Sequence, residues 1–203
     1  YGLAASSTAK TINNAQILTK PISLTGTRNY DGTTIVNSTD LTLGNFVAKE
    51  TLILSGTGSL SSANTQSNSS LASTASLSLA DGSNGGVVSN YTLTGGQHRV
   101  TVTKKPIKLS GSRKINRINR NIKLSSGQLR MGNQFKEDDV KLVGSTNVTV
   151  TSEGLNKIGT DGLTLSGKDA SNYTLLGETH EFLFELRAKF KAIKNIENKI
   201  NEL

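Results

Sequence analysis

Apolar and polar residues alternate over short stretches along most of this chain. Apolar residues two positions apart place their side chains on one face of an extended strand and leave Ser, Thr or Lys on the other face. This alternation predicts half-buried β-strands. The clearest pairs are Leu52 and Leu54, Leu77 and Leu79, Val100 and Val102, Val148 and Val150, and Leu163 and Leu165.

Glycine-containing turns separate these stretches, and threonine, which suits a pleated surface, is frequent within them. Short strands with turn signals at steps of roughly 8–12 residues are typical of an immunoglobulin-like sandwich or a related compact β fold. We therefore expect a mostly β chain of tandem modules of this kind. One larger β domain or a continuous β-helix is the alternative, but the short coil period of a β-helix is not visible.

The last segment has helical instead of alternating spacing, and glycine is absent from residue 181 onward. Its apolar stripe predicts a C-terminal amphipathic α-helix over 178–203. The helix could dock on the preceding β unit as a terminal cap, pair with another chain, or lie on a membrane surface. Nearly balanced charges argue against the membrane surface, and the charges exclude a membrane span. The stripe is Leu183, Leu186, Phe190, Ile193, Ile196, Ile200 and Leu203.

Two motifs recur at a period of about 80 to 90 residues, which is the length of a domain. Asn-Tyr-Thr-Leu occurs at 90–93 and 172–175, and Lys-Pro-Ile at 20–22 and 105–107, while the chain opens on Tyr1 as if on a third copy. The period divides the chain into closing strands of a preceding repeat (1–19), a full unit (20–104), a second unit (105–177) and the helical segment (178–203).

The repeated tyrosines stand out in a chain with four tyrosines, no tryptophan and an apolar content of 34%. A tyrosine at the start of a late strand can bury its ring in a thin core while its hydroxyl reaches a backbone group. The preceding asparagine suits a turn. We interpret Tyr91 and Tyr173 as packing anchors and not as ligand contacts.

The first full unit holds five short motifs in series: Lys20-Pro21, Leu24-Thr25-Gly26, Asn29-Tyr30-Asp31-Gly32-Thr33-Thr34, Leu52 to Gly58, and Asn90-Tyr91-Thr92-Leu93-Thr94-Gly95. Their order resembles the YDG-type repeat of filamentous-haemagglutinin-like bacterial surface adhesins, which are exported by two-partner secretion. The resemblance covers about residues 1–177. It implies passive extracellular modules in which Tyr30, Asp31 and Gly32 are structural anchors, and it supplies no catalytic residues.

The second unit departs from this pattern, because the basic stretch 113–123 stands where Tyr-Asp-Gly-Thr-Thr is expected. Residues 99–136 hold eleven Lys or Arg and no acid, in a chain of net charge +8. The stretch could be a solvated strand edge, or it could hold a sulfated glycan, a lipopolysaccharide phosphate or nucleic acid. Phe135 is its one candidate for base stacking, which argues against nucleic acid. The candidate polyanion-binding residues are Arg113, Lys114, Arg117, Arg120 and Lys123.

The sequence of this basic stretch is compatible with an edge strand, a loop or a short helix. Ile115, Ile118 and Ile122 have the spacing of a short amphipathic helix, although the intervening asparagines disfavour one.

Candidate catalytic residues are scarce. The two histidines, His98 and His180, lie far apart in sequence, and the absence of cysteine excludes thiolate zinc sites, thiol nucleophiles and disulfides. The acidic stretches at 137–139 and 81–86 lack the ligand spacing of a calcium loop and are better interpreted as turns. We expect no enzyme, no metal and no cofactor.

The sequence thus predicts a non-enzymatic structural or adhesive segment of a bacterial extracellular surface protein, contributing length and presenting binding surface. The expected partners are a host-cell glycan or protein receptor, neighbouring repeats, and another copy through the helix, in a role linked to virulence. The alternative is a polyanion-binding module that uses residues 99–136. A third possibility is an accessory domain that spaces or localises an enzyme.

Overall fold

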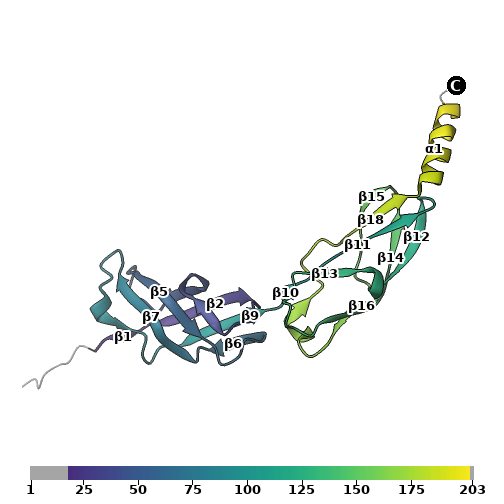
Figure 1. The fold of residues 1–203 in the computed structure, drawn as a ribbon. Coiled ribbons are helices and arrows are strands. Elements are labelled where there is room, and N and C mark those ends of the chain that lie inside the picture. The colour runs from purple at the N-terminus through teal and green to yellow at the C-terminus, as the bar shows by residue number, and fades with distance from the viewer. Residues whose placement is uncertain (1–17, 202–203) are drawn as a thin grey trace, which may run out of the picture.

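The computed structural model describes residues 18–201, which form two β modules placed end to end and a helix beyond the second module (Figure 1). This arrangement confirms the expected fold class of compact β modules followed by a C-terminal helix. The expected strands of a preceding repeat, at 1–19, lie almost entirely outside the described residues.

The first module contains two facing sheets and a short strand pair. A four-stranded sheet has the order β4-β2-β9-β6, a three-stranded sheet has the order β3-β5-β7, and β1 pairs with β8. The strands are β1 (Lys20–Pro21), β2 (Ser23–Asn29), β3 (Ile35–Asn37), β4 (Leu41–Gly44), β5 (Leu52–Ser59), β6 (Gln66–Ser70), β7 (Ser73–Asp81), β8 (Tyr91–Thr92) and β9 (His98–Thr103), with 3₁₀ turns η1 (Ser38–Asp40) and η2 (Val88–Asn90).

The second module repeats this topology element by element. Its sheets have the orders β13-β11-β18-β15 and β12-β14-β16, and β10 pairs with β17. The strands are β10 (Lys105–Pro106), β11 (Lys108–Ile115), β12 (Arg120–Ser125), β13 (Arg130–Gly132), β14 (Lys141–Val150), β15 (Gly154–Lys157), β16 (Leu163–Ser166), β17 (Tyr173–Thr174) and β18 (Glu181–Leu186), with 3₁₀ turns η3 (Ser126–Gln128) and η4 (Ala170–Asn172).

The register of the short strand pairs explains the repeated motifs. Lys20 lies opposite Tyr91 in a parallel pair, and Lys105 lies opposite Tyr173 in the equivalent pair. The Lys-Pro and Asn-Tyr motifs of each module are therefore neighbours in space. The long strands β2 and β9 also pair in parallel, as β11 and β18 do.

The glycine of the repeated Leu-Thr-Gly and Leu-Ser-Gly motifs permits a close approach between a strand and a turn. A Cβ at Gly26 would clash with the carbonyl group of Asp40, and a Cβ at Gly111 would clash with that of Gln128. Each glycine thus lets a 3₁₀ turn lie directly against the first long strand of its module.

One boundary predicted from the sequence is wrong. Residues 181–186 form strand β18, which closes the second module beyond residue 177, and the helix α1 spans Ala188–Asn201. Phe182 and Phe184 are fully buried and Glu185 is exposed, which is the period-two pattern of a strand. The sequence suggested a helix here because Leu183 and Leu186 are three positions apart, a spacing that also places two residues on one face of a helix.

The predicted apolar stripe of the helix is divided by this boundary. Leu183 and Leu186 belong to β18, whereas Ile193, Ile196 and Ile200 lie on α1 and are exposed. The side chain of Phe190 and residue Leu203 lie outside the described part. Docking of α1 on the second module is not observed, because every described side chain from 192 to 200 is exposed and the helix projects away from the sheets (Figure 1).

The basic stretch adopts a strand, a turn and a strand, and the possible helix at 115–122 does not form. Ile115 ends β11, Ile122 lies in β12, and both are buried in the core of the second module. The turn between them holds Asn116 to Asn119, and Asn119 has a positive φ of 56°. Such a φ is tolerated by asparagine better than by most residues.

Candidate functional site

The two modules meet at a cluster of aromatic and carboxylate side chains, which we call the module junction. Tyr30, which follows β2 of the first module, donates its phenol to Asp138 Oδ2 of the second module at 2.9 Å. Tyr173 donates to the same oxygen at 2.6 Å, and its own phenol oxygen accepts the backbone N–H of Phe135 at 3.0 Å. One carboxylate therefore joins a tyrosine from each module.

The rings at the junction pack edge to face. The Tyr30 ring lies 5.5 Å from that of Tyr173, at 74°, and 5.9 Å from that of Phe135, at 70°, measured between centroids. On the second module, Lys105 Nζ lies 4.8 Å from the centroid of the Phe135 ring. Edge-to-face pairs and a cation over a ring face are favourable arrangements, so Tyr30 is fixed in orientation as well as in position.

A second set of contacts lies beside the aromatic cluster. The backbone N–H of Thr65 donates to Asn172 Oδ1 at 2.9 Å, and Asn172 Nδ2 donates to Asn64 Oδ1 at 3.0 Å. Asn172 is 1% exposed, and these bonds satisfy both ends of its amide. Asn172, which precedes Tyr173, thus forms hydrogen bonds to the first module in addition to its place in its own turn.

Burial and the shared carboxylate change the acid–base properties of the two phenols. Burial, together with the hydrogen bond and negative charge of Asp138, raises the pKa of Tyr30 to about 12. The same causes raise the pKa of Tyr173 well above its ordinary value. Both phenols stay protonated, and so remain donors to Asp138, across the physiological pH range.

The apolar cores of the modules are continuous through the junction. Tyr30, Val36, Leu60, Val100 and Val102 of the first module belong to the same buried cluster as the core of the second module. A separate cluster of Ile22, Leu52 and Tyr91 lies at the outer end of the first module. A single residue, Lys104, separates β9 from β10, so the linker between the modules is too short to allow large movements.

The loop that presents Tyr30 is fixed by its own contacts. Arg28 is buried, forms an ion pair with Asp31 and donates to the carbonyl oxygen of Thr33 at 2.6 Å. Burial acts to raise the pKa of Asp31, but hydrogen bonds from Thr33 and the charge of Arg28 outweigh it and hold that pKa below its usual value. Gly32 has a positive φ of 77° and lies against Phe135.

Part of the predicted polyanion-binding set converges in a small cleft at the end of the second module nearest α1. The cleft has a volume of about 100 Å³ and brings together Arg113, Lys114, Arg120 and Arg187. Arg187 was not in the predicted set. Arg117 and Lys123 are exposed but do not line this cleft.

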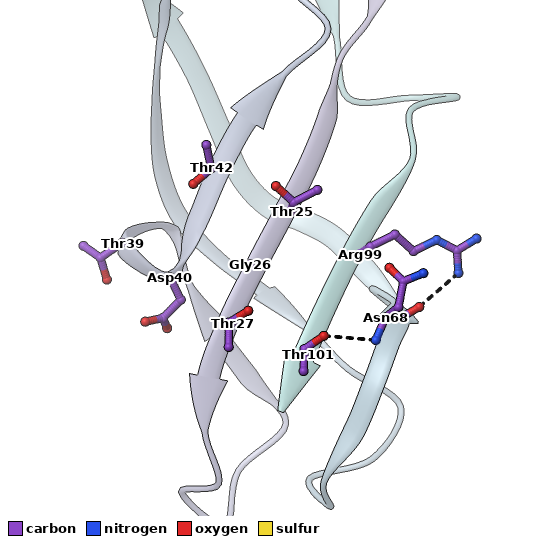
Figure 2. Close-up of a pocket in the computed structure, with 9 residues that line it drawn as sticks. All are labelled: Thr25, Gly26, Thr27, Thr39, Asp40, Thr42, Asn68, Arg99 and Thr101. Carbon is purple, nitrogen blue, oxygen red and sulfur yellow. Dashed lines mark hydrogen bonds between the residues drawn. The ribbon is translucent and has the colours of Figure 1, made fainter. Parts of the chain in front are cut away.

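A broader hollow of about 570 Å³ lies on the four-stranded sheet of the first module, and Figure 2 shows its lining. Thr25 and Thr27 on β2 and Thr101 on β9 point into it, and Arg99 and Asn68 lie along one side (Figure 2). Thr101 accepts the backbone N–H of Asn68, and Arg99 donates to Ser70 Oγ. The lining is polar and lacks an aromatic platform, so it offers hydroxyl groups without a stacking surface.

The two histidines have equivalent structural positions. His98 Nε2 lies 2.7 Å from the carbonyl oxygen of Leu93, and His180 Nε2 lies 2.7 Å from that of Leu175. His180 Nδ1 also accepts the N–H of Leu109. Within residues 18–201, no group of three His, Asp or Glu side chains is placed to hold a metal ion.

Sequence reasoning missed three residues of the junction. Asp138 was grouped with its acidic neighbours as part of a turn, and Asn64 and Thr65 belong to a polar stretch without a motif. The spacing of seven residues from Tyr91 to His98 recurs from Tyr173 to His180, and this repeat was the signal that could have located the end of the second module.

Comparisons with models of protein families, with curated proteins and with solved structures found no match to this chain. In the described part of the chain, no helix has the length and apolar character that a membrane crossing requires.

Proposed function

We propose that this chain is a non-enzymatic structural segment of a bacterial extracellular surface protein, in which rigidly joined β modules provide length and present surface for attachment. The module junction is the observation that supports this proposal. Domains of one chain normally move relative to one another unless their interface is well packed and apolar. Here a continuous core, a shared carboxylate and a one-residue linker act together against such motion.

The test is the distribution of distances between spin labels on the two modules. The chain has no cysteine, so Ser76→Cys and Asn147→Cys would provide the only two labelling sites, and both positions are exposed on strands. We expect one narrow distribution. Tyr30→Ala should broaden it, whereas Phe46→Ala should not, because Phe46 makes its edge-to-face contact with Tyr91 inside the first module. A broad distribution in the unsubstituted background would overturn the proposal.

The surface location and the adhesive role are parts of the same proposal and rest on the order of motifs around Tyr30, Tyr91 and Tyr173. Protease treatment of intact cells that carry the parent protein should release peptides from this segment. Release only after lysis would contradict an extracellular location.

A second candidate function is the binding of an anionic polymer, and the comparison of Arg28 with Arg113 favours it. The two arginines occupy equivalent positions in β2 and β11, but the partner Asp31 of the first module is replaced by Asn116 in the second. Among the ion pairs of residues 18–201, none includes Arg113, Arg120 or Arg187. Their cleft is smaller than a typical pocket for a small organic ligand and suits a single sulfate or phosphate group.

Retention on a heparin column tests this candidate. The triple variant Arg113→Ser, Arg117→Ser, Arg120→Ser should elute at lower salt than the unsubstituted chain. A matched control removes the same charge from exposed positions of the same module that lie outside the cleft, namely Arg130, Lys136 and Lys157. Equal losses in the two triple variants would indicate general charge attraction and would reject a specific site.

A further inference from the structure

The outer end of the first module has a hollow in the position that corresponds to the junction face of the second module. It has a volume of about 420 Å³, and its lining includes Leu18, Val47, Glu50, Asn90 and Tyr91. The corresponding residues of the second module are Thr103, Phe135, Asp138, Asn172 and Tyr173.

The equivalence of the two faces extends to individual hydrogen bonds. Tyr91 donates to Glu50 Oε2 at 2.5 Å, as Tyr173 donates to Asp138 Oδ2 at 2.6 Å. The N–H of Val47 donates to the Tyr91 phenol oxygen at 3.1 Å, as the N–H of Phe135 donates to that of Tyr173 at 3.0 Å. The preceding turns match as well, since Asn45 and Asn133 have φ values of 70° and 69°.

The two faces differ in what covers them. On the second module, Tyr30 covers Phe135 and Tyr173, and Asn172 is 1% exposed. On the first module, Val47 is 51% exposed and Leu18 is 74% exposed. Asn90, the counterpart of Asn172, is exposed too. Phe46 packs against the Tyr91 ring but is not part of the lining, so it leaves the hollow open.

We propose that this hollow is a socket for the Tyr-Asp-Gly loop of a further module of the same kind, joined ahead of residue 20. The tyrosine of that loop would pack on Tyr91 and Val47 and donate its phenol to Glu50. Within residues 18–201, Glu50 accepts one side-chain hydrogen bond, from Tyr91, and therefore has capacity for a second donor, as Asp138 does. The inference rests on the proposed function, because it extends the same junction by one module.

The occupant is an additional module and not a second copy of this chain. Tyr30 of a second copy is already buried in its own junction. The equivalent loop of the second module has Ile115, Asn116 and Arg117 in place of Tyr, Asp and Gly, so it offers no phenol. Modules of the first type can therefore be followed by another module through this contact, whereas the second module cannot.

The test uses a chain in which residues 20–104 are duplicated in tandem ahead of residues 20–203. This duplication places Lys104 of the added copy directly before Lys20 of the original copy, which reproduces the one-residue linker of the native junction. Spin labels at Ser76 of the added copy and Ser76 of the original copy report the new junction. Labels at Ser76 of the original copy and Asn147 report the native junction in the same protein.

We expect narrow distance distributions at both junctions. Tyr30→Ala in the added copy, or Glu50→Ala in the original copy, should broaden the distribution at the new junction and leave the native one narrow. A broad new junction beside a narrow native junction overturns the socket while the proposed function stands. A broad native junction overturns the proposed function itself.

Two further outcomes would also reject the socket as proposed. A new junction that is narrow but insensitive to both substitutions would mean that other contacts hold the modules together. A concentration-dependent dimer of the unextended chain in sedimentation, abolished by Glu50→Ala, would show that a second copy occupies the hollow.

Discussion

Replacement of Tyr30 by alanine should separate the folding of the two modules. The substitution removes two edge-to-face contacts, each contributing about 0.5–1.5 kcal/mol. It also removes a hydrogen bond to a carboxylate, which contributes about 1.5–3 kcal/mol. The expected loss is about 3–5 kcal/mol in the free energy of unfolding, the usual range for replacing a buried aromatic residue by alanine.

Urea unfolding followed by far-ultraviolet circular dichroism measures this loss. The unsubstituted chain should unfold in one transition, because its core is shared between the modules. Tyr30→Ala should unfold in two. Tyr30→Phe keeps the ring contacts and removes only the hydrogen bond to Asp138. It should lower the free energy of unfolding by about 1.5 kcal/mol, near the lower limit for a hydrogen bond to a charged group, because Asp138 still accepts the phenol of Tyr173.

Tyr91→Phe is the matched control, since it removes the equivalent phenol-to-carboxylate bond inside the first module. It should lower the stability of that module without splitting the transition. If Tyr30→Ala leaves both the midpoint and the shape of the curve unchanged, the junction contributes nothing to stability and the reasoning is refuted.

Three further predictions follow from the same contacts. The fold raises the pKa of Tyr30 from 10.0 to about 12, so the stabilisation by the protonated phenol should be intact below pH 10 and lost as the pH rises from 10 to about 12. Over this range the urea midpoint should fall less steeply with pH for Tyr30→Phe than for the unsubstituted chain. Equal slopes for the two proteins would contradict the raised pKa of Tyr30. Asn172→Ala should lower the free energy of unfolding in urea by about 1–3 kcal/mol, because the Thr65 N–H loses its acceptor, whereas Asn90→Ala should leave it nearly unchanged. Equal losses in the two variants would argue against a hydrogen bond across the junction. The exposed residues of α1 to be replaced together by serine are Ile193, Ile196 and Ile200. This triple substitution should change the free energy of unfolding by less than about 0.5 kcal/mol. A larger loss would mean that the helix packs on the β modules.

The repeat could be predicted from the sequence because its motifs are neighbours in the fold. Lys-Pro and Asn-Tyr recur together since each pair forms one short parallel ladder, from Lys20 with Tyr91 to Lys105 with Tyr173. The alternating pairs around Val100 and Val148 likewise became strands with those valines buried. Patterns that report local geometry and one buried face were sufficient for these elements.

The end of the second module was mispredicted because its sequence satisfies two periods. Phe182, Phe184 and Leu186 alternate as a strand, while Leu183 and Leu186 also suit a helix, and a true helix follows at Ala188. Only pairing with β11 and β15 selects the strand, and these partners lie about 25 to 70 residues earlier in the chain.

The junction could not be predicted from local patterns, because its partners are distant in sequence. Tyr30 and Asp138 are 108 residues apart, and Thr65 and Asn172 are 107 apart. Tyr30 was expected to be an anchor, and it is buried, but nothing in its neighbourhood indicated that its acceptor belongs to the other module. Asp138 gave no signal, since an acid in a turn is an ordinary feature.

The most direct test of a rigid junction is ¹⁵N relaxation of backbone amides in both modules of the unsubstituted chain. If the junction is rigid, amides of both modules will fit one anisotropic rotational diffusion tensor, as expected for two modules joined end to end (Figure 1). If each module instead fits its own faster and more nearly isotropic tensor, they move independently, and the contact of Tyr30 with Asp138 and Tyr173 does not provide the rigidity that the proposed function requires.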